Sequence, residues 1–209
     1  MARAFTGPLC RFFAGERGEA VTFVQGVEDW RKDLQSAFAK DRVPQFQWQE
    51  DPSVAASWSD LCDSGWIAVR LFEFYAEKSD LELPDTAPAL IELDREWREA
   101  ADQKFARSKY AHLLAARIWF PQDFAFTARI ALPDGEATEL GSLAVLRDQL
   151  RWLNARTFQA DEEQVATWAA LDAPAGGPLI QAAQRGYAAL WNAVEDATVR
   201  RVPLVLVEA

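Results

Sequence analysis

The spacing of hydrophobic residues along the chain predicts both helices and strands. Apolar residues three and four positions apart are typical of amphipathic helices, and apolar residues at every second position are typical of half-buried strands. On this basis we expect helices at Glu28–Lys40, from Thr86-Ala87-Pro88 to Phe105, at Leu143–Arg156, after Asp161-Glu162-Glu163 and at Leu179–Thr198. We expect strands at Val43–Gln49, Phe124–Leu132, Glu136–Leu140 and Val202–Val207.

Several of these elements carry recognisable start or stop residues. Ser142 stands where it can cap the helix Leu143–Arg156, because its hydroxyl accepts a bond from a free backbone N–H. The acids Asp161–Glu163 suit a helix start, where the helix dipole favours negative charge. The stretch Asp172–Pro178 contains proline and two glycines and is expected to be a loop between two helices. The apolar run Val202–Val207 suits a strand covered on both faces.

Other stretches have patterns that two structures can satisfy. Leu9–Ala14 and Ala20–Gln25 are interpreted as a hairpin turning at the glycines between them. A short helix is expected from Asp51-Pro52 to Gly65, with Val54, Trp58, Leu61 and Cys62 inside. For Trp66–Tyr75 a buried strand is preferred, with a helix as the alternative. Tyr110–Phe120 fits either a helix or a strand.

Together the elements predict an α+β fold. At 209 residues the chain has the length of one domain, so we expect a single α+β domain over residues 1–209. Its mixed or mostly antiparallel sheet would be covered by amphipathic helices. Half of the residues are hydrophobic and 26% are charged, which is the composition of a globular protein.

Charge and hydropathy restrict the partners and the compartment. Charged residues interrupt every apolar stretch before it reaches the roughly 18 residues that a membrane span needs, and no export signal is recognised at the N-terminus. A cytoplasmic protein is therefore expected. The net charge of −10 argues against nucleic acid or an anionic membrane as partner, since both are bound through Lys and Arg. A charged partner would be basic.

Few residues offer catalytic chemistry. The chain has one His and two Cys, and His112 has no second ligand or nucleophile at a recognised spacing. Cys10 and Cys62 form no CxxC motif and are expected to be reduced and buried. Neither a P-loop nor a hydrolase elbow occurs. We therefore predict no cofactor, no metal and no assigned catalytic residue.

An acidic stretch is the one charge feature that stands out. Residues 73–102 hold ten acidic and three basic residues. Glu92, Glu96, Glu99 and Asp102 stand at helical spacing, and an ordinary solvated face is the alternative to a functional one. A carboxylate metal site is set aside, because Arg95 and Arg98 favour salt bridges within the helix, including Asp94 with Arg98.

The nine tryptophans divide into two groups. The first group falls on apolar helix faces and is expected in the core: Trp30, Trp58, Trp97, Trp168 and Trp191. The second group is less well explained by packing and offers interface or pocket residues: Trp48, Trp66, Trp119 and Trp152. We predict that Glu92, Glu96, Glu99 and Asp102 bind a basic partner together with Trp48, Trp66 and Trp119.

Three functions remain open. In its acidity and its scarcity of catalytic residues the chain resembles bacterial immunity proteins, a likeness of composition without a shared motif. That resemblance implies a non-catalytic module that neutralises a basic toxin domain. The first alternative is a small-ligand binder or sensor with an aromatic-lined pocket, in which Arg117, Arg129 or His112 orients the ligand. The second is a carboxylate-based enzyme, for which no pair of acids identifies itself.

Overall fold

The protein forms an α+β fold around one mixed, mostly antiparallel sheet, as the sequence predicts. The computed structural model describes residues 2–15, 18–39, 43, 45–46, 48–78 and 80–208. The strands, in the order in which they lie side by side, are β2 (Ser57–Asp60), β1 (Ala2–Thr6), β6 (Leu204–Glu208), β3 (Ile118–Phe120), β5 (Ala137–Ser142) and β4 (Ala128–Ala131). Each neighbouring pair is antiparallel except β3 and β5, which are parallel.

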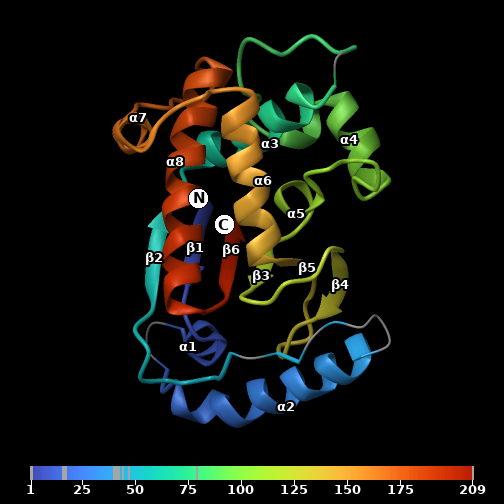
Figure 1. Ribbon diagram of the computed structural model, residues 1–209, viewed down its shortest axis with the longest axis vertical. Helices are drawn as coiled ribbons and strands as arrows, with labels where there is room; N and C mark the ends of the chain where they lie inside the picture. The colour runs from blue at the N-terminus through green and yellow to red at the C-terminus, as the bar shows by residue number, and fades with distance from the viewer. Residues whose placement is uncertain are drawn as a thin grey trace.

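Helices cover both faces of the sheet (Figure 1). They are α1 (Leu9–Ala14), α2 (Val21–Phe38), α3 (Asp63–Ala76), α4 (Arg95–Asp102), α5 (Ala111–Leu114), α6 (Leu143–Arg156), α7 (Glu162–Trp168) and α8 (Leu179–Arg200), with a short 3-10 helix at Ile91–Leu93 before α4. One hydrophobic cluster joins α3, α5, α6 and α8 to one face of the sheet, and a second joins α1 and α2 to the other. In Figure 1, α6 and α8 lie in front of the strands and α2 crosses the lower end.

The second half of the chain follows its predicted elements closely. Helix α6 has the predicted bounds, and the Ser142 hydroxyl caps it by accepting from the Val145 N–H at 3.3 Å. Asp161 begins α7 in a reciprocal capping box with Gln164. The loop 172–178 connects α7 to α8, and the final apolar run forms β6 in the interior of the sheet. Strand β5 pairs with β4 as expected, although β4 covers only part of the predicted Phe124–Leu132.

The predicted hairpin at Leu9–Ala14 and Ala20–Gln25 is wrong. These residues form α1 and the start of α2, which begins seven residues before the predicted Glu28. Gly15 has a positive φ of 65° and ends α1, so this glycine allows the backbone to leave a helix rather than to turn between two strands. A short apolar run cannot distinguish a buried strand from a buried helix.

The preferred strand at Trp66–Tyr75 is also wrong, and its alternative is right. This run lies in α3, which is buried on nearly all sides and packs extensively against α8. A helix enclosed on all sides shows no polar face, so its apolar residues run continuously as in a buried strand. The helix predicted from Asp51-Pro52 is replaced by a turn and by β2, and Gly65 lies inside α3 rather than ending a helix.

The strand predicted at Val43–Gln49 is not formed by those of its residues that the structure describes. The guanidinium of Arg31 donates instead to the carbonyls of Phe46 and Trp48, at 3.3 and 2.9 Å. These bonds satisfy the backbone without a sheet neighbour. Pro44 and Gln47 lie outside the described residues.

The long helix predicted from Pro88 to Phe105 is reduced to a 3-10 turn and α4. Asp94 accepts from the Trp97 N–H at 2.8 Å and so begins α4 at Arg95. Lys104 and Phe105 both have positive φ, which ends the helix. Residues 110–120, left open by the sequence, divide into α5 and β3. Within the described residues, none of the helices is both long and apolar enough to cross a membrane.

Candidate functional site

The three tryptophans predicted to bind a partner are buried. Trp48, Trp66 and Trp119 are 5%, 1% and 0% exposed. Each indole N–H donates inside the protein: Trp48 to Glu50, Trp66 to Glu208 and Trp119 to the His112 carbonyl. Their burial offers little indole surface to a partner, and the prediction that they bind one stays a prediction. Trp152 is 57% exposed, and Trp58, which was expected in the core, is 39% exposed.

The four acids of the predicted set lie on α4 and just before it, and line two separate hollows. Glu96 and Glu99 line one hollow, and Glu92 and Asp102 line another. Glu96 is half-buried, whereas the other three are exposed. Arg95 forms ion pairs with both Glu96 and Glu99 at 3.3 Å, so part of this negative charge is neutralised locally. Asp94 caps α4 instead of pairing with Arg98.

His112 is a structural residue. Its Nδ1 accepts from the backbone N–H of Ser142 at 2.8 Å, and the Ser142 hydroxyl donates to the Gln122 carbonyl at 2.7 Å. The imidazole and the hydroxyl are neighbours, but the nitrogen facing Ser142 is occupied by a backbone donor and cannot activate the hydroxyl. Burial lowers the pKa of His112, and the Ala125 carbonyl opposes that effect.

Cys10 is equally unsuited to chemistry. Burial and the neighbouring Glu50 carboxylate raise the pKa of its thiol to about 12, so the reactive thiolate is disfavoured. Cys10 and Cys62 are both free, and Cys62 is half-buried rather than fully buried. In the described part of the chain, no three His, Cys, Asp or Glu side chains gather as a metal ion would require.

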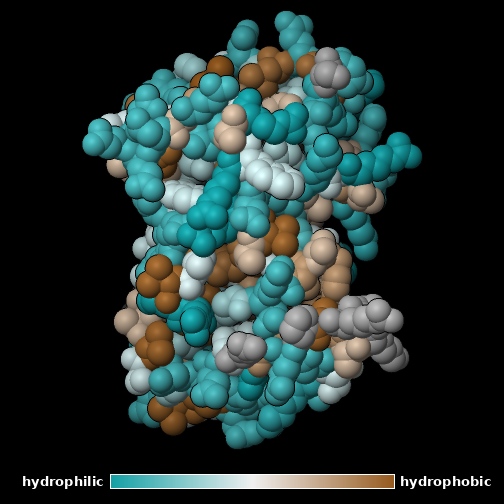
Figure 2. Space-filling view, in the orientation of Figure 1, coloured by the Kyte–Doolittle hydropathy of each residue, from teal (hydrophilic) through white to brown (hydrophobic). Residues whose placement is uncertain are grey.

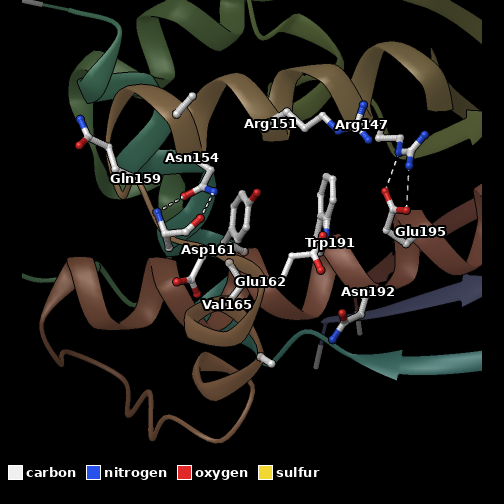
Figure 3. A pocket seen from close by; sticks show the side chains of 14 residues that line it. Arg147, Arg151, Asn154, Gln159, Asp161, Glu162, Val165, Trp191, Asn192 and Glu195 are labelled. Atoms are coloured by element: carbon white, nitrogen blue, oxygen red, sulfur yellow. Dashed lines mark hydrogen bonds and ion pairs between the residues drawn. The ribbon is translucent and has the colours of Figure 1, made fainter.

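A hollow of about 730 Å³ lies between α6, α7 and α8 (Figure 3). Its polar groups largely satisfy one another. Arg147 forms a two-pronged ion pair with Glu195 at 2.5 and 2.9 Å, and the Asn154 amide bonds both the N–H and the carbonyl of Ala160. The Arg151 guanidinium lies 5.8 Å from the ring centre of Trp191. These polar groups therefore already have partners within the protein and do not need a ligand to supply them.

A smaller cavity differs in this respect, and we call it the arginine pocket. It encloses about 440 Å³ and is bordered by α3, the 3-10 helix, α4, the segment after α5, and strands β4 and β5. Figure 1 shows α4, α5, β4 and β5 together on the right of the view. Its charged lining residues are Arg70, Glu92, Arg98, Asp102, Lys104, Arg117, Arg129 and Glu139. Five cations against three acids give it a positive excess in a chain whose net charge is −10.

Arg70 is the central residue of this pocket. It is 4% exposed, and its guanidinium lies between two indole rings, 4.9 Å from the centre of Trp66 and 4.7 Å from that of Trp97. One terminal nitrogen donates to the Leu114 carbonyl, and the buried Nε has no hydrogen-bond partner. Among the described residues, no carboxylate lies within ion-pair distance of Arg70.

Such a charge is costly to bury. Burial and the nearby charge of Arg117 lower the pKa of Arg70 well below its usual value, while Glu208 and Glu92 oppose the effect. Arginine nevertheless stays protonated in proteins, so the lowered pKa expresses how unfavourable the uncompensated charge is at this place. The two indole faces offset a part of that cost, typically about 2 kcal/mol or more each when the pair is desolvated.

Arg117 stands beside Arg70 just before β3. Its Nε lies 3.5 Å from one carboxylate oxygen of Glu208, and the other oxygen of Glu208 accepts from the Trp66 indole. Burial lowers the pKa of Arg117, and Glu208 and Glu92 oppose this. The register of the sheet fixes its place, because the Arg117 N–H donates to Glu139 and its carbonyl accepts from Leu206. Arg117 is thereby held at the pocket by both β5 and β6.

Sequence reasoning found part of this site. The sequence offers Arg117, Arg129 or His112 as the residue that orients a ligand; Arg117 and Arg129 line the arginine pocket, whereas His112 does not. Arg70 was missed because it lies in the run interpreted as a strand. The available signal was the charge itself: Arg70 and Glu73 interrupt an otherwise apolar stretch, and charged residues are seldom fully buried without a partner.

The fold and the site define an α+β protein with a cation-rich cavity at the side of a mixed sheet. Comparison of the chain with protein-family models, with curated proteins and with solved structures finds no match. The function is therefore argued from the chemistry of the cavity.

Proposed function

We propose that this protein binds a small anionic molecule in the arginine pocket. The observation that carries the proposal is Arg70, a guanidinium buried against two indoles with no carboxylate partner in the described part of the chain. A bound oxyanion would supply the missing counter-charge, and a charge-assisted bond to Arg is among the strongest that a protein makes. Arg117 would form the second arm of the clamp.

The size and lining of the pocket support the binding of a small molecule. A volume of about 440 Å³ lies within the usual range of small-molecule sites. Ile91, Leu114 and Phe105 give it an apolar wall, against which the body of a ligand can pack. The described lining contains no His, Cys, Ser, Thr or Tyr, so its charged groups are carboxylates, arginines and Lys104.

The test uses inorganic phosphate and acetate as probes, with sodium chloride at matched ionic strength as reference. Either probe should raise the thermal unfolding midpoint beyond the chloride reference. At a probe concentration of ten times its Kd, the free energy of unfolding should increase by about 1.4 kcal/mol. The Arg Nε–H signals of Arg70 and Arg117 in a 1H–15N spectrum should shift in the same titration.

Two variants and a matched control make the test specific. Arg70→Met and Arg117→Gln should abolish the anion-dependent stabilisation. Arg151→Gln, which removes an arginine from the larger hollow, should retain it. Stabilisation that survives in both pocket variants, or that chloride reproduces, would show that the anions act elsewhere and would refute the proposal.

A second candidate function is the binding of a basic protein, in the manner of a bacterial immunity protein. The observation that favours it is the exposure of Glu92, Glu99 and Asp102 around α4. On the face shown in Figure 2, hydrophilic residues predominate and hydrophobic ones occur in small groups, so such binding would depend on charge.

Its test is a pull-down with a candidate basic partner, followed by reversal of Glu92, Glu99 and Asp102 to Lys. The triple variant should bind the partner less tightly, and the slope of affinity against salt should become shallower. Unchanged affinity and an unchanged slope would exclude this surface. Reversal of the exposed Glu136, Glu162 and Glu163 is the matched control.

A further inference from the structure

We infer that the ligand of the arginine pocket is a zwitterion, with Glu92 selecting a cationic group next to the oxyanion that Arg70 and Arg117 bind. This inference rests on the proposed function and names the ligand class for the same site. It is carried by an arrangement of charges that is unusual for so small a cavity. Side chains of both signs line the cavity, yet they do not pair with one another.

The pair Arg129 and Glu139 shows this most clearly. The two residues are direct cross-strand partners in the antiparallel register of β4 and β5. Their Cβ atoms are thus about 5 Å apart, a position from which opposite charges ordinarily pair. No ion pair joins them within 4.0 Å, and both side chains line the cavity. Each charge is therefore left for another partner.

Glu92 and Asp102 repeat the pattern on the opposite wall. Both line the cavity together with Arg98 and Lys104, and in the described chain none of these four takes part in an ion pair. Arg117 is the one lining cation with such a contact, and its partner Glu208 lies outside the lining. A purely anionic ligand would leave these carboxylates uncompensated.

Glu92 is the carboxylate of the cavity lining that acts on both guanidinium groups, as Glu208 does from outside the lining. Its charge raises the pKa of Arg70 and of Arg117, in keeping with its place in the same cavity. It would repel a simple oxyanion placed between them. A ligand that carries an ammonium a few bonds from its oxyanion satisfies all three residues at once, because the oxyanion meets the two guanidinium groups and the ammonium meets Glu92.

Matched pairs of probes isolate the cationic group. Glycine differs from acetate by its ammonium, and 4-aminobutyrate differs from butyrate in the same way. Phosphoethanolamine against inorganic phosphate makes the same comparison for a phosphate, and phosphoethanolamine against the two amino acids tests whether the oxyanion is a phosphate rather than a carboxylate. In the native protein each zwitterion should bind more tightly than its partner by about threefold to tenfold, and the chain length of the best amino acid reports the separation of the two charges.

The Glu92→Gln variant gives the deciding result, because its effect has opposite signs for the two ligand types. Affinity for the zwitterions should fall about threefold to tenfold, and affinity for acetate and phosphate should rise. Glu162→Gln, at an exposed acid of the larger hollow, is the control and should change neither.

The outcomes separate the inference from the proposed function. If the native protein binds acetate or phosphate through Arg70 but shows no preference for zwitterions, the inference is wrong and the proposed function stands. If Glu92→Gln raises the affinity for both ligand types, Glu92 merely repels anions and the inference is again wrong. If no probe of either type binds, both fail.

Discussion

At the scale of single residues, α3 buries two ionisable side chains three positions apart. Arg70 faces the arginine pocket, whereas Glu73 is 0% exposed and lacks a hydrogen-bond partner at either carboxylate oxygen. Burial raises the pKa of Glu73 well above its usual value, the Glu77 charge adds to this, and Arg156 opposes it. The two neighbours therefore differ in state. Arg70 stays charged and needs a counter-ion, and Glu73 holds its proton.

The proton on Glu73 makes folding stability depend on pH. The folded protein keeps this proton at pH values at which the unfolded chain, with a carboxyl pKa near 4.3, has lost it. Stability should therefore fall as pH rises above about 4.3, by at most about 1.4 kcal/mol per pH unit, until the folded pKa is passed. Glu73→Gln removes this dependence. The free energy of unfolding of Glu73→Gln, minus that of the native protein, should thus increase from pH 5 to pH 8. Urea unfolding at each pH measures this difference.

A control separates this effect from general electrostatics. Glu136→Gln neutralises an exposed acid, and the difference between its free energy of unfolding and that of the native protein should hardly change with pH. If Glu73→Gln behaves like Glu136→Gln, Glu73 is not held protonated in the folded state.

At the scale of elements, α3 and α8 cross with their backbones in close approach. Gly65 and Gly186 meet there, and a Cβ built on Gly65 would lie 3.1 Å from the backbone of Gly186. A Cβ on Gly186 would overlap the carbonyl oxygen of Gly65. Because backbone cannot rotate away as a side chain can, the helices would have to separate. The crossing holds α3, and with it Arg70, against the rest of the fold.

A pair of glycine variants tests this contact. Gly186→Ala should destabilise the protein by about 2 kcal/mol or more through overpacking. Gly26→Ala, in the interior of α2 with nothing within 4 Å of the added Cβ, should stabilise it by about 0.5–1 kcal/mol. Thermal unfolding midpoints measure both. A Gly186→Ala protein as stable as the native one would mean that the helices do not approach so closely.

Helix α6, which has one polar face, was predictable, and the enclosed helix α3 was not. Helix α6 shows a regular seam of Leu143, Leu146, Leu150 and Leu153 beside exposed polar residues, so its period and its bounds follow from the sequence. Helix α3 has ten buried residues in fourteen and shows no such contrast. The helical period is visible in the sequence only where one face of the helix meets water.

At the scale of the whole molecule, the arginine pocket is assembled from residues between positions 70 and 139 that lie on several elements. Local pattern identifies cations such as Arg117 and Arg129 one at a time. Their convergence with Arg70 depends on the sheet order, in which β6 lies between β1 and β3, and on the α3–α8 crossing. Both are long-range pairings that spacing along the chain does not specify. The sequence therefore indicates which types of residue could form the site, but not which of them come together in the fold.

The position of β6 gives the last prediction. This strand joins β1 and β2 to β3, β5 and β4, and it buries Leu204, Val205 and Leu206. Burial of three such side chains contributes roughly 5–9 kcal/mol, which is comparable with the whole stability of a typical domain. A chain ending at Arg201 should therefore lose its cooperative thermal transition and its near-ultraviolet circular dichroism. A synthetic peptide of residues 202–209 should restore both in part, and a scrambled peptide should not. A truncated chain that keeps both signals would show that the two halves of the sheet hold together without β6.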